Sequence, residues 1–210
     1  MKTWKKYQQF TSHGEWHIHT TYTDGLNTVE EYCKKAEKLG IPLLAFTEHV
    51  RQSLSYDFKD FLSDISDARE KFDLQILSGC EAKVLPDGNL DVPGWVLESV
   101  DYPVFAFHSF PYNKVLYLDC LKKVIMHPSM NTWAHPGLFC VNNGIVLSQT
   151  ELYEIFSLMK KFDIALEYNK KYHLPQKEWI QTASLFQVQI IRGSDIHSVD
   201  RLVSYHGEFF

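Results

Sequence analysis

Histidine and carboxylate residues recur at the ends of short apolar runs in this sequence. These residues are His17, His19, Glu48, His49, Glu81, His108, His135, Glu167, Asp195 and His197. In an extended strand, residues i and i+2 lie on the same side, so His17 and His19 can bind one ion together. Asp195 and His197 repeat that spacing. Neutral imidazole combined with carboxylate suits zinc, manganese or iron, and no paired-cysteine motif indicates a structural zinc site.

The elements that must position these residues alternate along the chain. Seven apolar runs predict strands over 14–20, 43–49, 74–84, 104–110, 131–137, 164–169 and 188–197. Amphipathic stretches predict helices over 28–39, 56–72, 94–100, 116–126, 149–162 and 176–186. Alternating β and α segments with nearly continuous apolar strands predict a parallel sheet. Seven such units predict a closed or nearly closed βα barrel, whose C-terminal strand ends share the face where active sites are built.

Composition and charge are those of an ordinary globular domain. Of the 210 residues, 45% are apolar and 22% are charged, so we expect one domain over 1–210. The net charge of −5 offers no basic footprint for nucleic acid, although bound cations would not appear in that count. The sequence shows no signal-peptide pattern and no apolar run long enough to span a membrane. Four scattered cysteines indicate reduced thiols in a cytoplasmic protein.

Taken one at a time, the motifs have ordinary structural explanations. A single HxH occurs often by chance, His108 alone would be a core histidine, and Asp24 before Gly25 is typical of a turn or a helix start. Together they favour a metal cluster, because burying so many ionisable groups without cations would be very costly. Four other histidines fall outside the expected strand ends and are interpreted as structural: His13, His127, His173 and His206.

The ordered motifs resemble the PHP (polymerase and histidinol phosphatase) family. The matching segments are HIHTTYTDG, FTEH, GCEAKV, FHSF, WAHPG, LEYN and GSDIHS, which extend from about residue 16 to 198. The resemblance implies a distorted seven-stranded, TIM-like (β/α)7 barrel with a trinuclear metal site. All nine ligand positions of the family pattern are filled: His17, His19, Asp24, His49, Glu81, His108, His135, Asp195 and His197.

The resemblance also implies how these ligands divide among three ions. The first ion would be held by His17, His19, Glu81 and Asp195. Glu81 would bridge to a second ion bound by His108 and His135, and the third ion would be held by Asp24, His49 and His197. Glu81 and Asp195 would thus be the central carboxylates of the catalytic site.

Two or three divalent ions at the rim would favour a phosphate ester as substrate. A hydroxide bridging two ions is the expected nucleophile, because metal coordination lowers the pKa of water towards about 7. Glu48 and Glu167 are candidates to orient ligands through hydrogen bonds. Arg51 and Arg192 are candidate phosphate clamps, although a role as a surface or ion-pair residue is slightly favoured for each.

Three functions are compatible with this site. The leading hypothesis is hydrolysis of a small phosphomonoester, as in histidinol phosphatases. The alternative is a phosphodiesterase or nuclease, a reading that the missing basic stripe and stacking platform make less favourable. A non-catalytic metal-binding or regulatory domain is the third, and the intact set of nine ligands argues against it.

Overall fold

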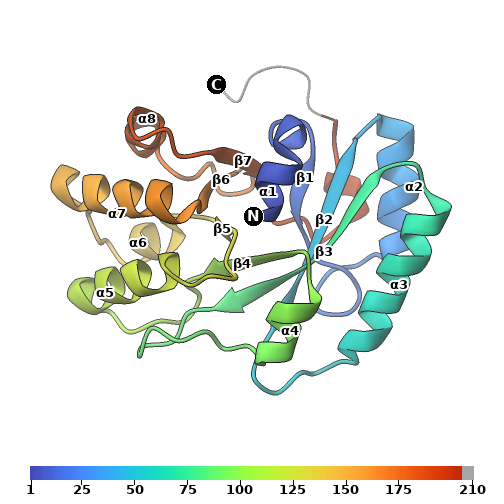
Figure 1. Ribbon diagram of the computed structural model, residues 1–210, viewed down its shortest axis with the longest axis horizontal. Coiled ribbons are helices and arrows are strands. Elements are labelled where there is room, and N and C mark those ends of the chain that lie inside the picture. Colours follow the sequence, from blue (N-terminus) through green and yellow to red (C-terminus); the bar gives the residue numbers. More distant parts are fainter. Residues whose placement is uncertain (205–210) are drawn as a thin grey trace.

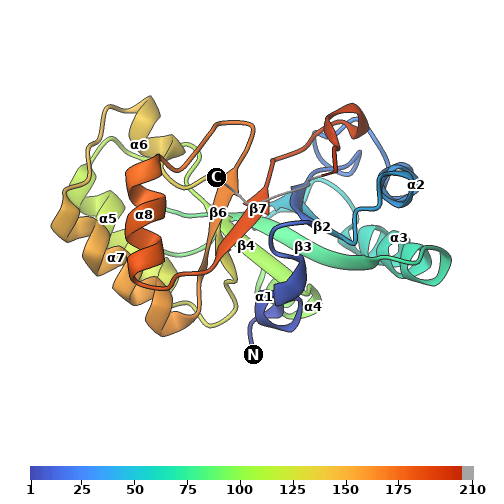
Figure 2. The ribbon, with the colours of Figure 1, turned by 90° about the horizontal axis from the view of Figure 1, so that it is seen from above.

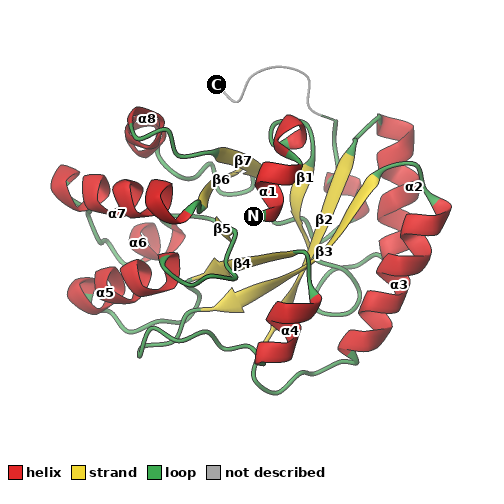
Figure 3. Cartoon of the chain, viewed as in Figure 1, coloured by secondary structure: helices red, strands yellow, loops and turns green. Residues whose placement is uncertain are grey.

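The computed structural model describes residues 1–204, and its centre is one sheet of seven parallel strands. The strands follow one another around the sheet in chain order. Their bounds are β1 Glu15–Ile18, β2 Leu43–Val50, β3 Gln75–Lys83, β4 Tyr102–Ala106, β5 Thr132–Trp133, β6 Ala165–Asn169 and β7 Ile190–Gly193. Figure 3 shows these strands in yellow at the centre, with the helices outside them. The alternation predicted from the sequence is confirmed.

The two ends of the sheet meet, so the sheet is a nearly closed barrel. Ile18 at the end of β1 forms a parallel bridge with Ile196, which follows β7. The His19 N–H donates to the Ile196 carbonyl at 2.8 Å, and the Ile196 N–H donates to the His17 carbonyl at 3.0 Å. The seven-stranded βα barrel expected from the sequence is therefore present.

Helices cover the outside of the barrel. They are α1 Thr3–Lys6, α2 Val29–Leu39, α3 Phe58–Lys71, α4 Gly94–Ser99, α5 Lys114–Ile125, α6 Leu138–Asn142, α7 Gln149–Phe162 and α8 Lys177–Leu185, with short 3-10 turns η1 Gln8–Phe10 and η2 Val199–Arg201. Figures 1 and 2 show α2 and α3 on one side and α5, α7 and α8 on the other. Reciprocal capping by Thr28 and Glu31 starts α2, which ends at Gly40 in the left-handed conformation.

Apolar side chains fill the barrel interior towards the N-terminal ends of the strands. The buried members are Trp4, Trp16, Leu43, Ala45, Leu77, Tyr102, Val104, Ala106, Ala134, Ala165 and Ile191. Helix α1 closes this end, where Trp4 Nε1 donates to the Asp163 carbonyl at 2.9 Å and the Thr3 N–H donates to Asn131 Oδ1 at 2.8 Å. The interior is thus a packed core at this end of the barrel.

Six of the seven strands, all but β2, are shorter than the sequence suggests. Strand β7 ends at Gly193, so Asp195, whose φ is 49°, and His197 follow the strand instead of lying in it. Strand β4 ends at Ala106, so His108 follows the strand instead of lying in it. Strand β5 ends at Trp133, because His135 has a φ of 30° and Pro136 has no N–H to extend the ladder. Helices α1 and α6 were not expected, since helical periodicity cannot show in four or five residues. Every helix among residues 1–204 is too short or too polar to cross a lipid bilayer.

Candidate metal centre

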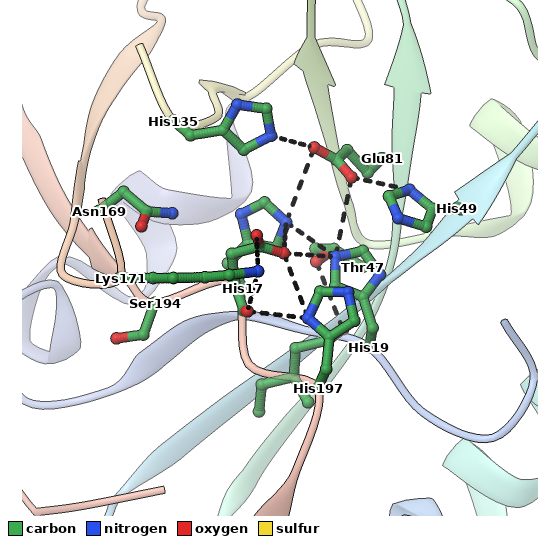
Figure 4. A network of polar contacts seen from close by, with 12 residues as sticks. His17, His19, Thr47, His49, Glu81, His135, Asn169, Lys171, Ser194 and His197 are labelled. Carbon is green, nitrogen blue, oxygen red and sulfur yellow. Dashed lines mark hydrogen bonds and ion pairs between the residues drawn. The ribbon is translucent and has the colours of Figure 1, made fainter. Parts of the chain in front are cut away.

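The imidazoles and carboxylates expected at the strand ends converge at the C-terminal end of the barrel (Figure 4). Strands β1, β2 and β3 carry His17, His49 and Glu81, and the segments after β1, β4, β5 and β7 carry the others: His19, Asp24, His108, His135, Asp195 and His197. Contacts of 4 Å or less link all nine side chains into one network. The structure therefore brings together every ligand position named from the sequence.

Glu81 is buried at the centre of three imidazoles. Its Oε1 lies 2.7 Å from His135 Nε2 and 3.4 Å from His108 Nε2, and its Oε2 lies 2.9 Å from His49 Nδ1. Burial would raise the pKa of Glu81, but His108 and His135 outweigh burial and hold that pKa well below its usual range. Glu81 is thus an ionised carboxylate with imidazoles at both oxygens, suited to sharing between cations.

Asp195 forms a second group with the two histidines of β1 and its end. The Nε2 atoms of His17 and His19 lie 3.0 Å apart, and Asp195 Oδ1 lies 3.7 Å from the first and 3.2 Å from the second. Burial would raise the pKa of Asp195, but the two imidazoles lower it below its usual range. Three donor atoms so close together form a compact site for one ion.

Asp24 belongs to a third, more exposed group. Its Oδ2 lies 3.2 Å from His197 Nε2 and 3.5 Å from His49 Nε2. The loop carrying Asp24 folds tightly against the end of β1, because a Cβ at Gly25 would lie only 2.2 Å from the His19 carbonyl oxygen. Glycine is required there for a close backbone approach.

The three groups share members. His19 lies within reach of Asp24, His49 and His197 as well as of Asp195. His49 lies against both Glu81 and Asp24 through its two ring nitrogens. The grouping implied by the family resemblance placed each histidine with one ion, so the structure shows a more interleaved cluster.

The donor set fits divalent first-row cations. Among the described residues, four buried ring or carboxylate atoms in the cluster make no hydrogen bond: His19 Nδ1, His49 Nδ1, Glu81 Oε2 and His108 Nδ1. The 2.9 Å contact between His49 Nδ1 and Glu81 Oε2 does not have the alignment of a hydrogen bond. Burial lowers the pKa of His19 to about 4, which keeps its ring neutral and able to bind a cation at neutral pH. Buried polar atoms without partners are costly, and a cation would satisfy the converging lone pairs.

Glu167 orients two of the candidate ligands. Its Oε1 accepts a hydrogen bond from His17 Nδ1 at 2.8 Å, and its Oε2 accepts one from the His135 backbone N–H. A Cβ at Gly193 would lie 1.9 Å from Glu167 Oε1, so only glycine leaves room for this carboxylate. A carboxylate that holds the far nitrogen of a ligating imidazole fixes the ring and its tautomer.

Glu48 acts on the loop before Asp24 and not on a histidine ring. It is buried, its Oε1 accepts from the Thr20 N–H at 2.9 Å, and its Oε2 accepts from the Thr23 hydroxyl. Burial raises the pKa of Glu48. Its contacts brace the segment that presents Asp24, which is an indirect form of the orienting role expected from the sequence.

The two arginines named from the sequence lie in or beside strands β7 and β2, and Arg51 contacts residues outside the set of candidate ligands. Arg51 Nε lies 3.7 Å from Asp91, and its Nη1 donates to the Val50 carbonyl at 2.6 Å. Arg192 is buried in β7 beside Ile191, which belongs to the barrel interior, so strand alternation places Arg192 on the outer face. Their role as phosphate clamps stays a prediction.

Two residues after β6 contact the cluster and were not predicted from the sequence. Lys171 Nζ lies 2.6 Å from Asp195 Oδ2, and the Tyr172 hydroxyl donates to the same oxygen at 2.9 Å. Only Lys170 separates them from the LEYN segment, and polar residues just after a strand end are the signal that could have revealed them.

A cavity of about 750 Å³ adjoins this side of the cluster. Lys171, Asp195 and His197 line it, together with His173. His173 therefore lies beside the site, unlike the purely structural position expected for it. His13 precedes β1 and contacts the Ser12 hydroxyl, and His127 precedes β5 and accepts from the Ser129 N–H. His206 lies outside the described residues.

Comparison with known proteins finds relatives of two kinds. The chain is 26% identical over 207 residues to the DNA polymerase/3'-5' exonuclease PolX of Bacillus subtilis, covering 90% of this chain and 35% of that protein. It is 29% identical over 128 residues to a probable phosphatase of Aliivibrio fischeri, covering 58% of this chain and 51% of that protein. The chain thus spans about a third of the length of the first relative and about half of the second.

A solved structure shares the fold across nearly the whole chain. Histidinol phosphate phosphatase from Lactococcus lactis, complexed with zinc, L-histidinol and phosphate, superposes with a TM-score of 0.71 at 17% identity, covering 91% of this chain and 88% of that one. The PHP domain family model matches residues 15–199, which include every candidate ligand. By this match, this chain belongs to the PHP domain family.

Proposed function

We propose that this protein is a metal-dependent phosphoesterase that hydrolyses small phosphomonoesters. The observation that carries the proposal is the Glu81 carboxylate, buried among three imidazoles and continuous with the Asp195 and Asp24 groups. Phosphatase-named relatives and the fold shared with a histidinol phosphate phosphatase support it. A dedicated histidinol phosphatase is one such enzyme, and the fold likeness alone does not select that substrate.

Three groups of donors support a site for two or three divalent ions. The residues that would hold them are the nine candidate ligands, and imidazole with carboxylate accepts zinc, manganese or iron. When bound, such ions would lower the pKa of water and neutralise charge on the phosphoryl oxygens. A trinuclear arrangement is the finer proposal, supported by the three overlapping groups.

Two carboxylates outside the ligand set would orient the candidate ligands. Glu167 holds the His17 ring and the His135 backbone, so both face Glu81 and Asp195 with fixed geometry. Glu48 fixes the turn before Asp24. Because the barrel interior beneath the cluster is packed with apolar side chains, water and substrate reach the site from the rim side.

Phosphodiester hydrolysis is the second candidate. The observation in its favour is the relative named as a DNA polymerase and 3'-5' exonuclease, which matches 90% of this chain. The chain carries a net charge of −5, so binding of a nucleic acid would depend on the ions at the rim and not on a basic surface.

The cysteines and the sheet bear on where the protein acts and on its number of domains. The four cysteines are free thiols buried in the fold, which supports the proposal of a reducing, cytoplasmic environment. A single sheet built from strands along the whole described chain supports one domain.

The test compares two esters on metal-loaded protein. Manganese- or zinc-reconstituted enzyme should hydrolyse 4-nitrophenyl phosphate with a higher kcat/KM than bis(4-nitrophenyl) phosphate, and chelation should abolish both activities. A higher kcat/KM for the diester would move the protein to the second candidate. Bound metal with no turnover of either ester would overturn the enzymatic proposal.

A further inference from the structure

The two carboxylate oxygens of Asp195 face different partners. Oδ1 faces imidazoles, at 3.2 Å from His19 Nε2 and 3.7 Å from His17 Nε2. Oδ2 faces the loop after β6, where it accepts from Lys171 Nζ at 2.6 Å and from the Tyr172 hydroxyl at 2.9 Å. A cation held at Oδ1 would therefore leave Lys171 at the edge of the same site.

The loop that carries Lys171 is pinned to the barrel. Asn169 and Leu174 exchange backbone hydrogen bonds of 2.7 and 3.1 Å, and this antiparallel bridge closes the loop of residues 169–174. Buried Asn169 also accepts from the Tyr172 N–H at 3.2 Å and donates to Glu167 Oε1 at 3.3 Å. Asn169 thus joins this loop to Glu167, the carboxylate that orients His17, so the loop that positions Lys171 is anchored beside the ligand cluster.

Lys171 is also open to a ligand. Its side chain is 42% exposed and lines the cavity of about 750 Å³ beside Asp195 and His197. Figure 4 shows Lys171 entering the cluster from the side of Asn169, across the view from His49 and Glu81. A substrate that approaches the candidate ions through this cavity meets the Lys171 ammonium group.

A phosphomonoester and a phosphodiester differ in charge at neutral pH. A monoester carries between −1.5 and −2, because its second pKa is about 6, whereas a diester carries a single negative charge. An ammonium group beside the ions favours the more highly charged ester, and a lysine can bind phosphate as a point charge.

We propose that Lys171 binds a non-bridging phosphoryl oxygen of the substrate and so selects phosphomonoesters over phosphodiesters. Tyr172 retains the hydrogen bond to Asp195 Oδ2 while the ammonium group contacts the substrate. The proposal rests on the phosphoesterase function proposed above, and it assigns a residue to the choice between its two candidate substrates.

The test uses four variants of the manganese-loaded protein. Lys171→Met removes the ammonium group, Lys171→Arg keeps a positive charge, and Tyr172→Phe removes the other contact to Asp195 Oδ2. Lys161→Met, at the exposed end of α7, is the matched control. The measurements are kcat/KM for 4-nitrophenyl phosphate and its bis ester, binding of inorganic phosphate and of dimethyl phosphate by calorimetry, and manganese affinity by chelator competition.

Lys171→Met should lower kcat/KM for the monoester and the affinity for inorganic phosphate about tenfold. The diester, dimethyl phosphate and manganese values should change less than about threefold, and Lys171→Arg should restore most of the loss. Equal losses for both esters, or weaker manganese binding in both Lys171→Met and Tyr172→Phe, would overturn the proposal, since Lys171 would then only position Asp195. If wild-type protein cleaves neither ester, the function fails, and the phosphate and dimethyl phosphate affinities still decide whether Lys171 selects the dianion.

Discussion

The two ends of this barrel solve opposite problems. At the N-terminal end, apolar side chains such as Leu77 and Tyr102 pack against one another beneath helix α1. At the C-terminal end, the same strands and the segments that follow them carry six imidazoles and three carboxylates, whose donor atoms lie close together. Strand β3 contains both, because Leu77 and Glu81 lie on one face of it, four residues apart. Burying ionisable groups at the C-terminal end costs folding free energy, and apolar packing at the N-terminal end offsets that cost.

Glu81→Ala should have the largest effect, and it should affect function. The change removes the carboxylate that joins His49, His108 and His135, so hydrolysis should fall to the detection limit and metal content should drop. Metal analysis and phosphate release check this, with circular dichroism to establish folding. A folded variant that keeps its metal and its activity would show that the cluster does not depend on Glu81.

Leu77→Ala should have the converse effect. Leu77 is buried, and truncating a buried leucine costs about 2–5 kcal/mol in unfolding free energy. Urea unfolding measures the loss, while manganese affinity of the folded protein should stay within about threefold of wild type. Strong loss of metal affinity in a protein that remains folded would mean that the two ends are coupled.

Glu167→Gln should give an intermediate effect on function. Loss of the carboxylate that holds His17 and the His135 backbone should cost about 10- to 100-fold in metal affinity or activity. Gly193→Ala should act in the same direction, because the new Cβ displaces Glu167, and Gly94→Ala is a control with open space around it. Equal activity of Gly193→Ala and Gly94→Ala would count against the orienting role.

Lys5→Ala should have the smallest effect. The Lys5–Asp163 ion pair lies on the surface beside α1, and such pairs contribute at most about 1 kcal/mol to stability. Trp4→Ala, the adjacent buried residue, should cost about 3–5 kcal/mol. Thermal unfolding of both variants compares them, and a larger loss for Lys5→Ala would show that charge rather than packing closes this end.

The sequence predicted that eight of the nine candidate ligands reach the rim, because these eight lie at the ends of apolar runs and parallel strands end at one face. Asp24 lies in a polar loop, and only the family resemblance indicated it. The sequence did not predict which residues become neighbours. His49 lies beside Glu81 because β2 and β3 pair in that register, and register is a property of the assembled sheet. The contacts among these side chains interleave the three groups, and the division of ligands among ions stays a prediction.

The features missed from the sequence depend on loops and on tertiary packing. Lys171 reaches Asp195 only because the loop closed by Asn169 and Leu174 turns back over the barrel. Helix α1 is too short for a periodic signal and is held in place by Trp4 and its neighbours. No short-range pattern encodes such contacts, since their partners lie far away along the chain.

Closure of the barrel through Ile18 and Ile196 bears on how the protein is synthesised. His17 and His19 belong to the first strand of the barrel and its end, and they are translated before Asp195, which follows the last strand. The group of these three side chains cannot form until β7 has been translated and the segment after it has paired with β1. A chain that still lacks β7 would therefore lack this group of ligands, and because such long-range pairing is slow, metal binding at His17, His19 and Asp195 should report closure of the barrel.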